Sequence, residues 1–369
     1  GGGVQSSYTV DGQSQDSLNS DDGDAISFAD TTGQGTDYQT MLAPFNKSSS
    51  NGGAPNGNAS RVASQTSAAS NSVAAAKPTG LAASVKAAAP VTSVPDGTVA
   101  FIGVGTTVNA GHDVNLRAQD AVSYNGVAGN IVGGGVAIGA SIVIATVDCN
   151  TEAYVDNNAT VSAGSGAGDD ILIRAAFSDN LRGGAYAGSG GAISLGAQVV
   201  VITDSSDVRA YVDGGANITQ AGGTLSVEAS SDRTSHAQLA SVSIGGVVAG
   251  VGVAEAIQTG ATEAFIGNAN VGQVAGLTVG NVAVDAFASG VAVADAYGVA
   301  AGIGPLAVTA NIAIAKTDPT VTAAIFDGAK VNVAGDLSVK ARSLGNAHAF
   351  AVGVAVSGGV SLGGSIAKA

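Results

Sequence analysis

A segment of about 55 residues recurs five times after residue 97, and this repeat limits the fold more than any other feature. The opening of each copy contains an aromatic or aliphatic residue, and a turn rich in Asx and Gly follows it. The openings are VAFIGVGTTVNAG from Val99, TEAYVDNNATVSAG from Thr151, VRAYVDGGANITQAG from Val208, TEAFIGNANVGQVAG from Thr262 and TAAIFDGAKVNVAG from Thr322. We place the units near residues 97–150, 151–206, 207–260, 261–319 and 320–369.

A second segment recurs after each opening, and its residues follow the order apolar, any, apolar, charged, Ala. It reads HDVNLRA up to Ala118 and GDLSVKA up to Ala341. Apolar and polar residues alternate with a period of two, so we predict a strand with one buried face and one face in water. The charged place holds either sign, which is typical of a position exposed to solvent.

One residue of each opening falls in register with the others, and we predict that these residues stack in a column between neighbouring units. The Asx/Gly pair then turns the chain. The predicted stacking residues are Phe101, Tyr154, Tyr211, Phe265 and Ile325.

The third part of each unit is rich in Gly and Ala, as in GVAIGASIVIATV. Val136, Ile138 and Ile144 share one face of this segment, and Ala137 and Val143 share the other. Neither face is charged, so we expect both faces to be covered. Residues 129–147 carry no charge, but their Gly and β-branched content favours a strand over a membrane helix.

One unit holds too few large apolar side chains to fold alone, so the units must stack on one another. The chain has 55 glycines, a hydrophobic content of 45% and only 4% aromatic residues. We therefore predict an all-β fold, a repetitive Gly/Ala/Val-rich β-solenoid or stacked array of short strands over residues 97–369.

Residues 1–96 differ in composition and indicate an extended, low-complexity arm or linker. Ser, Asn and Gly tracts occur there, together with Pro44, Pro55, Pro78, Pro90 and Pro95. Isolated strands are expected within residues 6–12 and 24–33.

The net charge of −14 argues against nucleic acid and against anionic membrane surfaces, because both partners need a basic footprint. No membrane insertion is expected. Cys149 is the single cysteine, so an intrachain disulfide is excluded, and its apolar neighbours favour an inert side chain over a nucleophile.

One short segment raises the question of a metal ion. SGAGDDILI, residues 165–173, matches a calcium-binding nonapeptide except at its first place. It indicates either calcium at Asp169 and Asp170 or a turn that enters a strand, and the single copy favours the turn. No other cofactor is indicated, and no nucleophile elbow, phosphate loop or zinc spacing occurs, so we expect no enzyme.

The repeats at residues 97–369 resemble those of large secreted bacterial filamentous adhesins, of the filamentous-haemagglutinin-like and leukotoxin types. The resemblance rests on segments such as EAYVDNNATVSAG, DDILIRA and GGAISLGAQVVVITDSS. It implies a β-solenoid, export to the bacterial cell surface, and a structural or adhesive role without catalysis.

Two functions follow from these observations. The first is an extracellular structural subunit of a bacterial surface fibre or sheath, which assembles head to tail with copies of itself through strand pairing. The predicted assembly edge is Ser365, Ile366 and Ala367, which align with the end of the preceding unit. The alternative is a stalk segment of a giant adhesin that binds a cell-surface, matrix or glycan ligand through a tip outside this chain.

Overall fold

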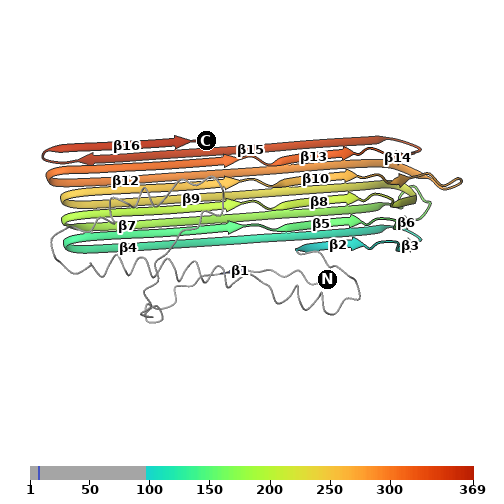
Figure 1. Cartoon of the computed structure of the whole chain (residues 1–369), viewed down its shortest axis with the longest axis horizontal. Helices are drawn as coiled ribbons and strands as arrows, with labels where there is room; N and C mark the ends of the chain where they lie inside the picture. The colour runs from blue at the N-terminus through green and yellow to red at the C-terminus, as the bar shows by residue number, and fades with distance from the viewer. Residues whose placement is uncertain (1–6, 9–96) are drawn as a thin grey trace. The chain divides into compact units, whose positions relative to one another are not determined.

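The computed structural model describes residues 7–8 and 97–369, and these residues form an all-β solenoid (Figure 1). No helix occurs within this part of the chain. The predicted arm strand at residues 24–33 lies outside the described residues. Of residues 6–12, only β1 (Ser7–Tyr8) is described, and it pairs in parallel with Ser123 and Tyr124.

Each repeat supplies a short strand, then in most repeats a very short strand, then a long strand. The short strands are β2 (Thr98–Ile102), β5 (Asn150–Val155), β8 (Asp207–Val212), β10 (Ala261–Ile266) and β13 (Thr320–Ile325). The very short strands are β3 (Thr107–Asn109), β6 (Thr160–Ser162), β11 (Asn270–Val271) and β14 (Lys330–Val331). The long strands are β4 (Val114–Val147), β7 (Ile171–Asp204), β9 (Asn217–Gln258) and β12 (Val279–Thr317), and the last repeat divides its long strand into β15 (Leu337–Val356) and β16 (Val360–Lys368).

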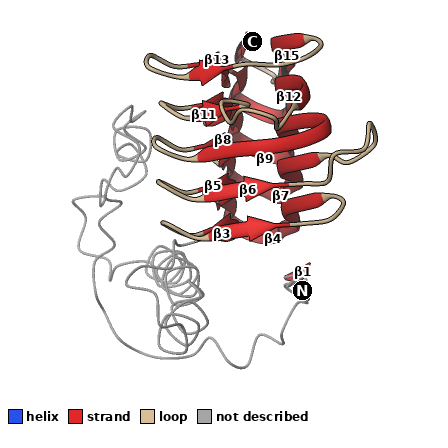
Figure 2. Cartoon of the chain, turned by 90° about the vertical axis from the view of Figure 1, so that its right-hand side faces the viewer, coloured by secondary structure: helices blue, strands red, loops and turns tan. Residues whose placement is uncertain are grey.

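Every strand of one repeat pairs in parallel with its equivalent in the next repeat. The short strands form a sheet in the order β13-β10-β8-β5-β2, and the long strands pair in the order β4-β7-β9-β12 before β15 and β16. One repeat is therefore one coil of the solenoid, and the stacked coils share continuous backbone ladders (Figure 2).

Each long strand folds back on itself, so a coil has an outgoing leg and a return leg. The fold-back lies at the end of the coil remote from the short strands (Figure 1). The two legs face each other across the interior, where the Ser194 hydroxyl donates a 2.7 Å hydrogen bond to Ser189. Glycine is required at the fold-back, because a Cβ atom on Gly191 would collide with the Gly134 carbonyl oxygen and one on Gly245 with that of Gly191.

The core lies between the legs and consists mainly of Ala, Val, Ile and Leu. Ala137, Val143 and Ala145 of the first return leg point into it and are buried. The expectation that both faces of this segment are covered is wrong, because Val136, Ile138 and Ile144 are 60%, 41% and 47% exposed. The return leg is a wall of the coil, so only its inner side meets the opposite leg.

Candidate functional site

Four aromatic side chains form a continuous stack on the outer side of the short strands. Phe101, Tyr154, Tyr211 and Phe265 occupy one register column. The ring centroids of successive pairs are 5.4, 4.7 and 4.9 Å apart, and the rings are nearly parallel. Each ring therefore covers the rings of the neighbouring coils, which ties the coils together beyond their backbone ladders.

The fifth predicted stacking residue, Ile325, does not belong to this column. Phe265 pairs with Ala324, whereas Ile325 pairs with Ile266 in the inward column. The prediction aligned the last opening one residue too far, and in a strand such a slip exchanges the two faces. The inward position keeps Ile325 against the core, and Phe326 contacts the Phe265 ring edge-on, at 5.2 Å between centroids.

An ion-pair ladder runs beside the aromatic stack. Arg209 lies between Glu152 of the coil before and Glu263 of the coil after, at N···O distances of 3.6 and 2.9 Å. Burial, followed by the charges of Asp156 and Glu152, raises the pKa of Tyr154 to about 12. The phenol in the stack therefore stays neutral at physiological pH.

The two predicted calcium ligands use their carboxylates to bind the protein itself. Asp169 accepts a hydrogen bond of 2.6 Å from the Gly166 N–H, and its other oxygen lies 3.1 Å from His112 Nδ1. Asp170 accepts a 2.7 Å hydrogen bond from the Thr224 N–H of the next coil. Among residues 7–8 and 97–369, no cluster of three or more His, Cys, Asp or Glu side chains has the arrangement of a metal site.

Asp170 is one member of a column of Asx side chains that sequence reasoning missed. Asp113 accepts a 2.9 Å hydrogen bond from the Asp170 N–H, as Asp170 does from Thr224. Asn281 accepts a 2.8 Å hydrogen bond from the Asp336 N–H. The capped donors of Asp170 and Asp336 directly precede β7 and β15, and that of Thr224 lies at the equivalent place within β9. The only signal of this column in the sequence is an Asx residue just before the alternating segment.

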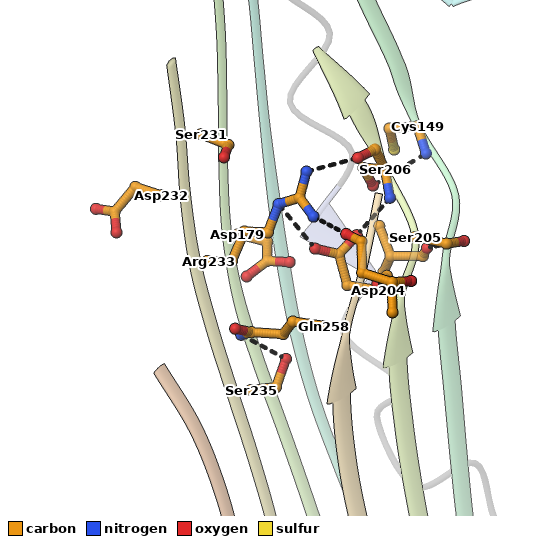
Figure 3. Close-up of polar contacts among 12 residues, drawn as sticks. Cys149, Asp179, Asp204, Ser205, Ser206, Ser231, Asp232, Arg233, Ser235 and Gln258 are labelled. Carbon is orange, nitrogen blue, oxygen red and sulfur yellow. Dashed lines mark hydrogen bonds and ion pairs between the residues drawn. The ribbon is translucent and has the colours of Figure 1, made fainter. Parts of the chain in front are cut away.

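A buried charged cluster crosses the core between the second and third coils (Figure 3). Arg233 is 2% exposed, and its Nε lies 3.3 Å from Oδ2 of Asp204, which is 0% exposed. The guanidinium also donates to the carbonyl oxygens of Thr259 and Ser206, at 2.5 Å for Ser206. Asp179 lies beside this pair and accepts a 2.7 Å hydrogen bond from the Thr234 N–H.

The two carboxylates of this cluster share one cation. Burial, followed by the charge of Asp204, raises the pKa of Asp179 to about 8, and the Thr234 N–H and Arg233 only partly oppose this shift. Asp179 is therefore protonated at neutral pH, and Arg233 then balances Asp204 alone. The cluster consists of one ion pair and one neutral acid. It joins the two coils through the hydrogen bond from Arg233 to the Ser206 carbonyl oxygen and the one from the Thr234 N–H to Asp179.

Sequence reasoning missed this cluster, although a signal was present. Asp179, Asp204 and Arg233 each fall on the inward parity of an otherwise apolar alternating segment. A charged residue at such a place predicts a buried partner. The identity of that partner depends on which legs face each other, and the fold-back sets this.

Cys149 lies at the edge of the core, where its backbone N–H donates a 3.1 Å hydrogen bond to the Ser206 hydroxyl. Burial is the main cause that raises the pKa of its thiol to about 11. The thiol is therefore protonated at neutral pH and is a weak nucleophile.

The predicted assembly edge lies in β16, the return leg of the last coil. Ser365, Ile366 and Ala367 pair with residues 311–313 of β12. Among the described residues, β13, β15 and β16 pair with the preceding coil on one side only. The other side of this coil presents backbone N–H and C=O groups, which form a template for a further strand.

No protein family, no curated protein and no solved structure matches the chain. Within residues 7–8 and 97–369 there is also no helix with the length and apolar character needed to cross a membrane.

Proposed function

We propose that the chain is a structural module of an extracellular bacterial fibre or sheath, in which coils continue from one copy to the next by strand pairing. The observation that carries this proposal is that, among residues 7–8 and 97–369, β13, β15 and β16 pair on one side only, with an in-register ladder on that side. The free side has the same strand directions as the side that already binds a coil, with an outgoing leg in β15 and a return leg in β16. A first coil can therefore add to it as the fifth coil adds to the fourth, once β1 has left Ser123 and Tyr124 of the first coil.

The side-chain columns support this mode of addition. A first coil stacked on the fifth would bring the Asp113 N–H next to Asp336, repeating the cap that joins Asp113 to Asp170. It would also place Arg117 beside Lys340, but the same column already tolerates Arg117 beside Arg174. Exposed like charges of this kind are screened by salt.

The role is mechanical in this proposal. Continuous ladders bear load along the axis, and the aromatic stack and the Arg233 cluster fix neighbouring coils in register. The net charge of −14 keeps such an assembly soluble. Extracellular placement rests on this acidic surface and on the resemblance to secreted filamentous adhesins.

The test is electron microscopy of the purified 369-residue chain. We expect filaments that lengthen with protein concentration. Proline substitutions in β16 then locate the contact, because adjacent residues of a strand direct their N–H groups to opposite sides. Of Ser365→Pro and Ile366→Pro, one removes a donor that faces β12, and the other removes a donor that faces the free side.

Both proline variants should shorten the filaments, but only the one whose N–H faces β12 should also lower the melting temperature. Single short rods for the parent chain at every concentration would overturn the proposal. That result would favour a stalk segment that contributes length to a larger adhesin.

A further inference from the structure

A continuous apolar surface covers the outer side of the outgoing legs near the fold-back. We call it the apolar face, and it consists of the outward positions of residues 129–133, 186–190, 240–244, 297–301 and 352–356, which lie side by side in the five coils. Its large side chains include Val242, Ile244, Tyr297, Val299, Val354 and Val356, which are between 39% and 59% exposed. An exposed apolar patch of this extent marks an interaction surface.

The bulk of the side chains is distributed unevenly over this face. In the first two coils, Gly129, Gly133, Gly188 and Gly190 occupy outward positions, and Ile131 and Tyr186, which are 92% and 41% exposed, project between them. The other three coils contribute no glycine at the equivalent positions, which carry Ala, Val, Ile and Tyr side chains. The face is therefore more even over the last three coils than over the first two.

We propose that two copies of the chain pair laterally through the apolar face, with their solenoid axes antiparallel. A two-fold axis between the copies brings the same surface of each into the contact, so that the first coils of each copy face the last coils of the other. Sheets that pack face to face in this way lie about 10 Å apart.

Area and charge both favour a second copy as the occupant. Three columns about 7 Å apart over five coils about 4.8 Å apart cover about 500 Å², so two copies bury about 1,000 Å² in total, the lower size of a specific interface. None of the residue ranges that form the face contains Asp, Glu, Lys or Arg, although the chain has a net charge of −14. Two acidic copies can therefore approach each other at this face without charge repulsion.

A lipid surface fits the face less well. A bilayer would leave the free backbone groups at the ends of the coil stack without partners in hydrocarbon, and each such group is costly there. Pairing with a second copy leaves these groups in water. The lateral contact is independent of the end-to-end contact proposed above, since the first uses side chains on the wall and the second uses strand edges.

The test compares two valine-to-glutamate variants of the full chain. Val299 lies on the apolar face and is 40% exposed, whereas Val291 lies on the same strand, points to the same side, is 37% exposed and lies outside the face. Val299→Glu places like charges against the partner copy and should raise the dissociation constant of the lateral dimer about 100-fold or more. Val291→Glu should leave it unchanged.

The measurements are the mass in solution by analytical ultracentrifugation and the width of the particles by electron microscopy. We expect double-width particles for the parent and for Val291→Glu, and single-width particles of unchanged length for Val299→Glu, with the same circular dichroism spectrum and melting temperature for all three. Equal width for Val299→Glu and the parent, or single-width particles for the parent that float with phosphatidylcholine vesicles, would overturn the proposal. Shorter filaments of unchanged width for Val299→Glu would instead contradict the end-to-end contact through strand edges, because a side chain on the wall would then affect it.

Discussion

At the scale of single residues, Asp179 makes the stability of the solenoid depend on pH. Its pKa is raised to about 8 in the folded chain, whereas an Asp in an unfolded chain titrates near about 3.9. The folded state therefore binds one more proton than the unfolded state between these values. The stabilising contribution of this group is complete below about pH 4 and is lost as the pH rises towards 8, by about 1.4 kcal/mol per pH unit.

Asp179→Asn should remove this slope, because the amide keeps an oxygen for the Thr234 N–H and carries no charge. We expect the difference in unfolding free energy between variant and parent to grow with pH between about 5 and 7. Guanidinium denaturation at several pH values measures it. A constant difference over this range would show that Asp179 is ionised in the fold.

Gly245 tests the packing of the fold-back. A Cβ atom there would meet the Gly191 carbonyl oxygen, whereas one on Gly135, in the same region of the first coil, would meet no atom within 4 Å. Gly245→Ala should therefore destabilise the chain by about 1–3 kcal/mol, as overpacking does. Gly135→Ala is the matched control and should be neutral or slightly stabilising. Equal unfolding midpoints for the two variants would contradict the tight stacking of the fold-backs.

At the scale of elements, a substitution in the Asx column tests whether Asp170 caps a backbone N–H or binds calcium. Asp170→Ala removes the acceptor for the Thr224 N–H, so we expect a loss of about 0.5–1.5 kcal/mol. Addition of millimolar calcium should leave the melting temperature of parent and variant unchanged in differential scanning calorimetry. A calcium-dependent rise in the parent that disappears in Asp170→Ala would restore the metal interpretation.

The strands also show which parts of the fold can be predicted from the sequence. Alternation and self-alignment predict an all-β stack of repeats, because a backbone ladder needs only the right period in each copy. The self-alignment misplaces Ile325. It matched Ile325 to the aromatic residues because of its size, whereas the structure places its side chain in the inward column beside Ile266. Alternation and self-alignment also treat the return leg as covered on both faces, since sequence alone does not reveal that the long strand folds back and becomes an outer wall.

The contact among Asp179, Asp204 and Arg233 could not be predicted from the sequence for the same reason. Asp179 and Asp204 lie on opposite legs of one coil, and Arg233 lies in the next coil. Their contact depends on both the fold-back and the stacking. A local pattern therefore reveals that each residue is unusual, but it does not reveal their contact.

At the scale of the whole solenoid, the coils are equivalent in backbone and different in charge. Each coil contacts mainly its two neighbours, so the stability of the stack is approximately a sum over coils and the contacts between them. Removal of one complete coil should therefore leave a shorter solenoid that still folds. The cost depends on which side chains lose their partners.

Two deletions make this dependence measurable. Deletion of residues 261–319 removes the fourth coil and retains Asp179, Asp204 and Arg233 together. Deletion of residues 207–260 removes the third coil, including Arg233, and brings the buried carboxylates against the fourth coil, whose inward positions there are Gly290 and Thr317. Loss of one partner of a buried ion pair costs about 3–5 kcal/mol, so the second deletion should be less stable than the first by about that amount.

Circular dichroism with guanidinium denaturation of both chains at pH 7 measures the difference between the two deletions. Equal stability of the two deletions at pH 7 would mean that the stack gains nothing from the Arg233 cluster, and that ladders and apolar packing alone hold the coils in register.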